Sequence, residues 1–365
     1  MTQRTKQRHS RRDALRAGFA ATLGATALGG DRPRAAAQDL PADGVRAIYL
    51  NPLATDAAEV VALLDLIDAT ELNAVVVDVK EDGVYLPTEV EVFLDAGEVN
   101  PDVLDADALL AEAAARGIWT IARIVTFRDA YLAAARPDLA VLDSETGAPW
   151  LSYDGLAWLN PLKQETWEAY RAFAVELAER GFDEIQFDYV RFPSDGDMWR
   201  IDVGVELDET LRSDTIAAFL GFCRAALSPL GAVTAADIFG YTLLIDDIGI
   251  GQNVGKMARN ADVLCPMVYP SHFPDGSILV PGRPNDYPAE TIAISLQAGA
   301  ERIDPSRLRP WLQDFSLAGM SAYGPVEVRA QIDAAEANGA EGWMLWSADS
   351  VYTTAALAPA GEEGG

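Results

Sequence analysis

Short runs of apolar residues alternate along most of the chain with polar loops and with stretches whose apolar residues recur at helical spacing. A strand followed by a helix, repeated many times, is typical of a parallel sheet. Eight strands can be recognised. They are expected over residues 45–50, 74–79, 119–125, 184–189, 233–238, 263–268, 309–313 and 342–346. The helices between them are expected over residues 56–69, 106–116, 165–180, 209–227, 254–260, 289–298 and 326–338.

Eight such units across about 300 residues predict a single α/β domain, a (β/α)8 TIM barrel over residues 45–354. An open doubly wound sheet would have a glycine-rich phosphate loop after its first strand, and residues 51–55 (NPLAT) contain no glycine. The long connections follow strands two, three, four and six, on the C-terminal face where such barrels carry their active sites. Residues 38–44 are expected to be a linker and residues 355–365 a disordered tail.

The first 37 residues are expected to be an export signal and not part of the barrel. Residues 10–16 (SRRDALR) approach the twin-arginine pattern, with Ala14 where a phenylalanine is commoner, and a weakly apolar stretch follows. Residues 35–37 (AAA) form a small-residue cleavage site. We therefore expect export by the twin-arginine pathway, to the periplasm or the cell exterior. No later apolar run is long enough to span a bilayer, so no integral membrane segment is expected after cleavage.

Charge restricts the class of partner. The chain carries 28 Lys and Arg against 56 Asp and Glu, a formal net charge of −28. Such a surface repels nucleic acid and anionic lipid, which excludes both as partners. An anionic polymer would also be a poor substrate unless the binding cleft is locally basic.

Residue counts exclude several kinds of site. Cys223 and Cys265 are too few for a disulfide scaffold or a zinc cluster, and we expect them in the core, one on a helix and one on a buried strand. His272 is the only histidine after signal removal, which excludes zinc sites built on two or three histidines. A Ser-His-Asp hydrolase would need His272, and no G-x-S-x-G, P-loop or dinucleotide motif is present. The leading interpretation therefore requires no cofactor and no metal.

The fourth expected strand places a carboxylate inside the barrel. Side chains alternate along a strand between the barrel interior and the helix layer. Ile185 and Phe187 suit the helix layer, so Asp188 points inward at the C-terminal mouth. Burying an isolated carboxylate is costly, so Asp188 is either functional or paired with an arginine such as Arg191 or Arg123.

A second carboxylate, Asp237, ends the fifth expected strand. Adjacent strands are about 4.8 Å apart. Asp188 and Asp237 can therefore approach the separation of about 5–5.5 Å that is typical of retaining glycosidases. In such a pair one carboxyl stays ionised and the other is held protonated. The alternative is that Asp237 caps a helix or pairs with an arginine.

Other residues at the expected strand ends are candidates for substrate binding. Asp78 and Lys80 share a parity and can both face the site, although a plain salt bridge explains them equally well. Arg123 lies among apolar residues, an unusual place for a charge unless it meets an interior carboxylate. On strand seven either Gln313 or Asp314 points inward. The remaining candidates are Tyr49, Arg191, Tyr269, His272 and Trp346, of which the aromatic residues are either stacking platforms for sugar rings or core residues.

Five segments together resemble a known family. They are residues 72–80 (LNAVVVDVK), 187–193 (FDYVRFP), 265–272 (CPMVYPSH), 309–315 (RPWLQDF) and 342–346 (GWMLW). The resemblance is to a bacterial family of uncharacterised proteins described as a putative glycoside hydrolase domain and related to the α-amylase and α-galactosidase barrels. It covers nearly all of residues 45–352.

The resemblance implies roles for three residues. In the related barrels the aspartate of strand four is the nucleophile, which corresponds to Asp188. The amylase group has a glutamate after strand five as the acid/base, and Asp237 stands there in this sequence. An aspartate after strand seven that stabilises the transition state corresponds to Asp314. The strand-six aspartate of the galactosidase-type barrels has no counterpart here.

Three functions agree with these features. The leading one is a retaining glycoside hydrolase acting on an oligo- or polysaccharide, with Asp188 as nucleophile and Asp237 as acid/base. A magnesium-dependent enzyme would instead use Asp129, Asp188 and Asp237 as ligands and Lys80 as base. A non-catalytic carbohydrate-binding barrel would bind glycans without cleaving them. Sensitivity to a chelator discriminates the second function, and binding without hydrolysis the third.

Overall fold

The computed structural model describes residues 40–361. The predicted export signal, the start of the linker and residues 362–365 lie outside the described residues. None of the helices in the described range combines the length and apolar character needed to cross a bilayer.

Eight parallel strands close into a barrel, as the sequence predicts, in the order β1-β10-β9-β8-β7-β5-β3-β2. They are β1 (Arg46–Leu50), β2 (Ala74–Lys80), β3 (Trp119–Val125), β5 (Glu184–Asp188), β7 (Val233–Phe239), β8 (Val263–Met267), β9 (Trp311–Gln313) and β10 (Trp343–Trp346). Each lies within a few residues of its expected range. The seventh is the shortest, and it begins only after Pro310, which has no N–H to donate to a sheet.

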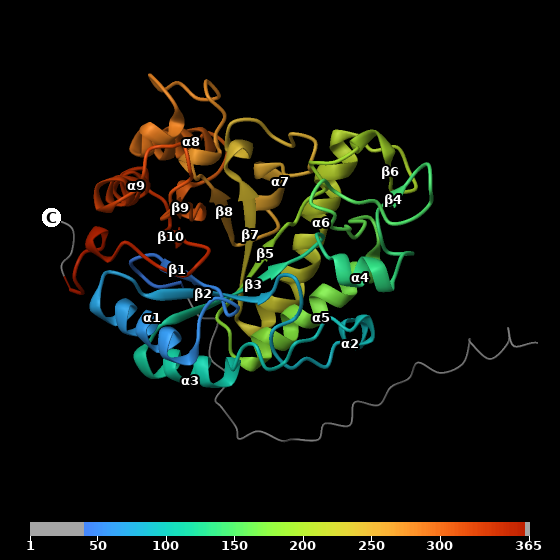
Figure 1. Cartoon of the computed structure of the whole chain (residues 1–365), viewed down its shortest axis with the longest axis horizontal. Coiled ribbons are helices and arrows are strands. Elements are labelled where there is room, and N and C mark those ends of the chain that lie inside the picture. The colour runs from blue at the N-terminus through green and yellow to red at the C-terminus, as the bar shows by residue number, and fades with distance from the viewer. Residues whose placement is uncertain (1–39, 362–365) are drawn as a thin grey trace, which may run out of the picture. The chain divides into compact units, whose positions relative to one another are not determined.

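Helices surround the strands on the outside of the barrel (Figure 1). They are α1 (Ala57–Ala69), α2 (Glu91–Ala96), α3 (Ala106–Arg116), α4 (Ala130–Ala135), α5 (Gln164–Arg180), α6 (Glu209–Leu227), α7 (Val254–Ala258), α8 (Pro288–Ala300) and α9 (Pro325–Ala337). All seven expected helices are present. The short helices α2 and α4 and the two-stranded sheet of β4 (Leu142–Asp143) and β6 (Ile201–Asp202) lie in the long connections and were not predicted. Short 3₁₀ helices occur at Met198–Arg200, Ser228–Leu230, Gly240–Leu243, Pro270–His272, Pro284–Asp286, Pro305–Arg307 and Thr354–Ala356.

Two apolar layers account for most of the core. A small cluster that includes Val76, Ile121 and Ala235 fills the barrel interior. A much larger cluster packs the outward faces of the strands against the helices. This division follows from the alternation of side chains along each strand. Cys223 on α6 and Cys265 on β8 are both buried, as expected.

The N-terminal end of the barrel interior contains a buried ion-pair cluster. Arg309 has no solvent exposure, and its Nη1 lies 2.7 Å from Oε1 of Glu184, the first residue of β5. Its Nε donates to Glu341 at 2.5 Å. Because a buried charge must be paired, this cluster is a structural unit at the end opposite the expected site.

The segment 355–361, assigned from the sequence to a disordered tail, packs on the barrel. Leu357 is 9% exposed, and Pro359 forms a β-bridge with Thr70 after α1. Glu71 accepts a hydrogen bond from the Ala358 N–H and donates its own N–H to the Ala358 carbonyl. Its sequence, AALAPAG, has no apolar period from which these backbone contacts could be predicted.

Candidate active site

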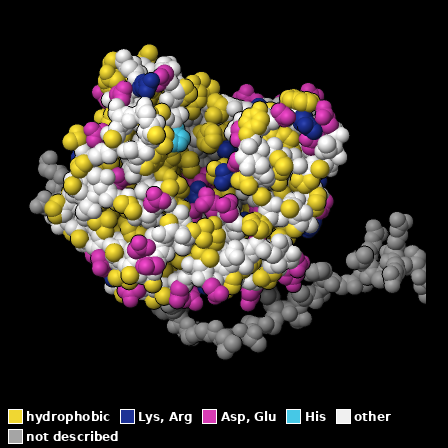
Figure 2. Space-filling model, in the orientation of Figure 1, with side chains coloured by type: hydrophobic (Ala, Val, Ile, Leu, Met, Phe, Trp, Pro, Cys, Tyr) yellow, Lys and Arg dark blue, Asp and Glu magenta, His cyan; other side chains and the backbone are white. Residues whose placement is uncertain are grey.

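A cavity of about 430 Å³ opens at the C-terminal ends of the barrel strands. Figure 2 shows a hollow in which acidic and basic side chains gather. Its volume is in the range typical of small-ligand and substrate sites. Six residues selected from the sequence line it: Arg123, Asp188, Arg191, Tyr269, His272 and Trp346.

Asp188 is the last residue of β5 and lines the cavity. The next residue, Tyr189, has a φ of +49°, in the left-handed region. Non-glycine residues rarely adopt this conformation, and strain of this kind is concentrated at functional sites. The Tyr189 N–H also donates to Asp188 Oδ1 at 2.5 Å. The sharp turn therefore fixes the Asp188 carboxylate and brings the Tyr189 side chain to the cavity wall.

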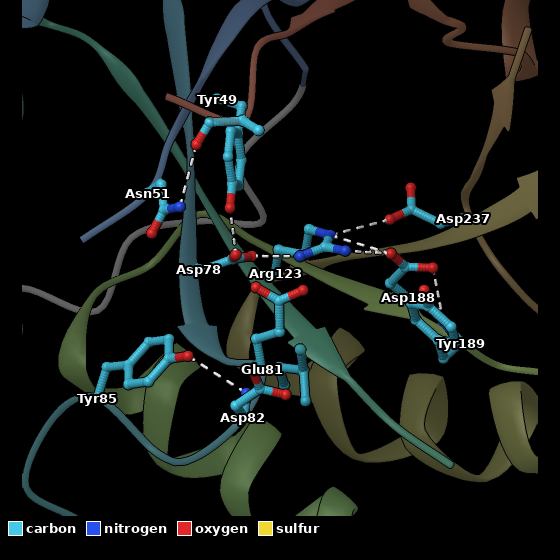
Figure 3. A network of polar contacts seen from close by, with 12 residues as sticks. Tyr49, Asn51, Asp78, Glu81, Asp82, Tyr85, Arg123, Asp188, Tyr189 and Asp237 are labelled. Carbon is cyan, nitrogen blue, oxygen red and sulfur yellow. Dashed lines mark hydrogen bonds and ion pairs between the residues drawn. The ribbon is translucent and has the colours of Figure 1, made fainter. Parts of the chain in front are cut away.

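The guanidinium of Arg123, from β3, lies at the centre of a carboxylate network (Figure 3). Its Nε donates to Asp188 Oδ2 at 3.1 Å, and its Nη2 donates to the same oxygen. Its Nη1 donates to Asp78 at 2.5 Å, and its Nε lies 3.6 Å from Asp237 Oδ2. Burial opposes the charge of Arg123, but Asp78 and Asp188 raise its pKa well above the usual value. Arg123 therefore remains cationic and orients Asp188.

Tyr49 and Asp78 support this network from behind the cavity wall. Both are buried and neither lines the cavity. The Tyr49 hydroxyl donates to Asp78, and burial raises the pKa of both groups. The Tyr49 ring stacks on Trp346 with centroids 4.0 Å apart, and the Arg123 guanidinium lies 5.2 Å from the Trp346 centroid. These contacts hold Arg123 and Trp346 in place.

Asp237, from β7, is enclosed by protein and does not line the cavity. Its Oδ1 accepts a hydrogen bond from Trp311 Nε1 at 2.7 Å, while Oδ2 has no hydrogen-bond partner in the described part of the chain. Burial, together with the charge of Asp188, raises the pKa of Asp237 well above its usual value. The strand spacing does bring Asp188 and Asp237 to one arginine. However, Asp237 has no direct contact with the space that a sugar would occupy.

Glu81 lines the cavity and was not selected from the sequence. It follows directly on β2, and Figure 3 shows its carboxylate directed toward Asp78 and Arg123. Burial and the charge of Asp78 raise the pKa of Glu81 to about 7. A carboxyl group with such a pKa is suited to act as a general acid near neutral pH. Its position at a strand end was the only sequence signal that could have identified it.

Aromatic and imidazole rings form much of the remaining wall. Tyr269 and His272 follow β8, with ring centroids 5.4 Å apart. The His272 Nδ1 lies 3.0 Å from Ser271 Oγ, and burial lowers the pKa of His272, which favours the neutral imidazole. Further lining residues, not selected from the sequence, are Tyr189, Phe239, Tyr241 and Phe273. The wall therefore offers ring faces for apolar contact beside the carboxylates.

Lys80 points away from the cavity although its parity matches that of Asp78. The register between β2 and β3 shifts after Asp78, so that Lys80 pairs with Ile124. This irregularity turns Lys80 into the helix layer, where its Nζ lies 3.1 Å from Glu98 and 2.9 Å from Asp129. A β-bulge reverses the face of the residues that follow it, and the sequence pattern does not reveal it.

The ligand set of the magnesium hypothesis is therefore divided. Asp129 is paired with Lys80, accepts from the Tyr170 hydroxyl at 2.6 Å and caps α4, away from the cavity. Asp188 and Asp237 meet Arg123, which takes the place of a cation. Within residues 40–361, no group of three or more His, Cys, Asp or Glu side chains is arranged to hold a metal ion.

The Lys80 ion pairs give a prediction for stability. We expect Lys80→Met to lower the free energy of unfolding by roughly 3–5 kcal/mol, because it leaves the buried Glu98 and Asp129 without their counter-charge. Urea unfolding followed by circular dichroism measures this. Lys256→Met is the control, since the Lys256–Asp214 pair is open to solvent, with side chains 28% and 61% exposed, and should cost about 1 kcal/mol at most. Equal losses in the two variants would contradict the prediction.

Gln313 and Asp314, between which the sequence did not decide, both lie outside the cavity lining. Gln313 accepts a hydrogen bond from the Ser271 N–H at 3.0 Å and donates to the Phe315 carbonyl at 3.0 Å. Asp314 accepts from the backbone N–H and the hydroxyl of Thr353 at 2.8 and 2.6 Å. They connect loops around the mouth, and Gln313 positions the segment that carries His272.

Residues 47–352 match the model of a family described as "Putative glycosyl hydrolase domain". The chain belongs to this family. The match confirms the resemblance that the strand-end motifs suggested. It also supports a glycosidase activity for the chain.

Solved structures share the barrel at low sequence identity. The glycoside hydrolase domain of PgaB (BpsB) from Bordetella bronchiseptica is 14% identical, with a TM-score of 0.63 over 84% of this chain and 94% of that chain. A β-galactosidase from Halorubrum lacusprofundi is 12% identical, with a TM-score of 0.60 over 86% of this chain and 56% of that chain. A chitinase from Chromobacterium violaceum is 12% identical, with a TM-score of 0.52 over 86% and 98% of the two chains. No curated protein matches the sequence.

Proposed function

We propose that this cavity hydrolyses a glycosidic bond of an oligo- or polysaccharide, with retention of configuration and with Asp188 as the nucleophile. The observation that carries the proposal is the Asp188 carboxylate at the cavity surface, held by Arg123 and by the strained turn at Tyr189. Attack on an anomeric carbon needs such a fixed carboxylate. Family membership supports the same chemistry. The expected export signal agrees with a glycan substrate outside the cytoplasm.

We assign the acid/base role to Glu81 in place of Asp237. Glu81 lines the same cavity as Asp188, whereas Asp237 does not line it and contacts Arg123 and Trp311. In the first step Asp188 would attack the anomeric carbon while the Glu81 proton passes to the leaving oxygen. In the second step Glu81 would take a proton from water, whose oxygen displaces Asp188 from the sugar. Asp237 would then influence the site only through Arg123. Its raised pKa favours the protonated form, so it adds little negative charge beside the guanidinium.

A panel of α- and β-linked oligosaccharides tests the function. The full chain is incubated with each member, with and without a chelator, and released sugars are detected by mass. NMR of the first product identifies its anomer. Cleavage that ignores the chelator and gives a product of the substrate's own anomeric configuration would support the proposal. Binding without cleavage would favour the carbohydrate-binding alternative, and loss of activity with chelator the magnesium alternative.

The pH dependence follows from the position and pKa of Glu81. The general acid must be protonated, and the Glu81 pKa of about 7 means that this form predominates below pH 7 and is lost above it. We therefore expect kcat/KM to fall as the pH rises through about 7. Initial rates between about pH 5 and about pH 9 measure this. A profile that stays flat across neutral pH and declines only in strong alkali would assign the proton to another group.

A further inference from the structure

Arg191 is a second arginine of the cavity wall, and it forms no ion pair with a carboxylate of the described residues. It lies in the loop after β5 and is 5% exposed. Its Nη1 donates to the Phe192 carbonyl at 3.0 Å and lies 3.2 Å from Ser194 Oγ. Within residues 40–361, no carboxylate forms an ion pair with its guanidinium, and Asp188 and Asp195 act on its charge only from a longer distance. Arg123, the other arginine of the wall, is in contrast paired with Asp78 and Asp188.

Aromatic rings surround the Arg191 guanidinium. Its central carbon lies 4.6 Å from the Phe239 centroid, 4.7 Å from that of Trp158 and 5.0 Å from that of Tyr189. Ring faces attract a cation and fix the plane of the guanidinium. They do not accept the hydrogen bonds that its edge offers. Nε and Nη2 have no acceptor in the described chain, and neither atom is fully enclosed.

This arrangement is unfavourable for an empty cavity and favourable for an anionic ligand. A buried cation without a counter-charge is costly. Burial lowers the pKa of Arg191 to about 10, so the side chain is still charged at neutral pH. The planar edge of a guanidinium matches the two oxygens of an oxyanion. An oxyanion that enters the cavity would supply the missing acceptors and a direct ion-pair partner.

We propose that the glycan bound in this cavity carries an oxyanion substituent, a carboxylate or a sulfate, which Arg191 recognises through its free edge. This inference rests on the proposed function of the cavity as a glycan site. The net charge of −28 makes general adhesion of an anionic polymer unfavourable. Selectivity for an anionic sugar therefore needs a local basic group, and Arg191 is a basic group of the cavity wall without a carboxylate partner. Neutral sugars would leave its charge unpaired.

A binding experiment on the full chain tests this. Each uronate-containing oligosaccharide of an array is printed beside its carboxyl-reduced and its sulfated counterpart. We expect the best ligand to be anionic and to bind roughly 10- to 100-fold more tightly than its neutral counterpart, the range of a charge-assisted hydrogen-bonded pair. The ratio between uronate and sulfate members shows which oxyanion the site takes. A neutral best ligand, or no binding of any anionic member, would overturn the proposal.

Two variants attribute the preference to Arg191. Arg191→Met keeps an apolar stem among the rings and should reduce the anionic preference to within about 3-fold, since the charge-assisted bonds are lost. Arg191→Lys keeps the charge without the planar edge and should retain part of the preference. Thermal unfolding of each variant checks its fold. The comparison of anionic and neutral glycans on the wild-type chain does not depend on either variant. If Arg191→Met keeps the wild-type preference for anionic glycans, Arg191 is not the group that recognises the oxyanion.

Turnover of the same glycans separates this inference from the proposed function. If anionic glycans are preferred and Arg191→Met abolishes the preference but nothing is cleaved, the hydrolase proposal fails and the anion site stands. If neutral glycans are cleaved and the ratio of kcat/KM between charged and neutral members is the same in Arg191→Met, the hydrolase proposal stands and the anion site is overturned.

Discussion

Asp188→Asn is expected to lower kcat by roughly 10⁴-fold or more, the scale of removing a catalytic nucleophile. The amide oxygen can still accept the Arg123 hydrogen bonds, but an amide does not form the glycosyl ester. Arg123 keeps Asp78 as its anionic partner, so the barrel should remain folded. Steady-state rates on the substrate found by the panel measure the effect. Asp138→Asn is the matched control, since Asp138 also pairs with an arginine, Arg136, but on an exposed surface.

Chemical rescue then distinguishes a nucleophile from a residue that only orients the substrate. Asp188→Gly opens space for a small anion at the position of the carboxylate. With azide and an activated aryl glycoside, we expect a glycosyl azide of inverted configuration, because the azide attacks from the side that Asp188 occupied. Product NMR reads the configuration. If Asp188→Asn retains activity near that of Asp138→Asn, the nucleophile lies elsewhere and the central proposal fails.

Three sequence signals pointed to the residues of this network. Alternation predicted that Asp188 points into the barrel, Arg123 was an unusual charge among apolar residues, and Asp237 ended the next strand; the three side chains meet around Arg123. The reason is physical: a closed parallel barrel sends every second side chain inward, and a charge inside it needs a partner. Charged residues within apolar strands are therefore informative even without the structure.

Strand alternation could not predict where side chains point once the regular strand pairing ends. The register shift after Asp78 turns Lys80 outward, and Glu81 then lines the cavity. Likewise, the left-handed turn at Tyr189 determines where Arg191 goes. The pattern also does not reveal how deeply a side chain is buried: Asp237 ends its strand as predicted, but it is enclosed and does not line the cavity. Loop conformation and depth depend on tertiary packing, which a local period does not encode.

Glu81→Gln is the second substitution with a large expected effect. Glutamine keeps the shape of the side chain but has no proton of suitable acidity, so the leaving oxygen departs unassisted. We expect kcat/KM for natural glycosidic bonds to fall by roughly 10²–10⁴-fold, the usual contribution of a general acid. An aryl glycoside whose leaving group needs no proton should lose far less. The ratio of the two losses is a readout that a merely structural role for Glu81 would not change.

The pH profile gives an independent check on the same variant. In the wild type the decline through about pH 7 reflects ionisation of Glu81, which is held back by burial and by the charge of Asp78. Removing the titrating group should remove this limb from the residual activity on natural glycosidic bonds. Asp237→Asn provides the comparison: it should alter rates without removing the limb, because Asp237 acts through Arg123. If Asp237→Asn abolishes the limb and Glu81→Gln preserves it, the proton comes from Asp237, and the cavity must open toward Trp311 during the reaction.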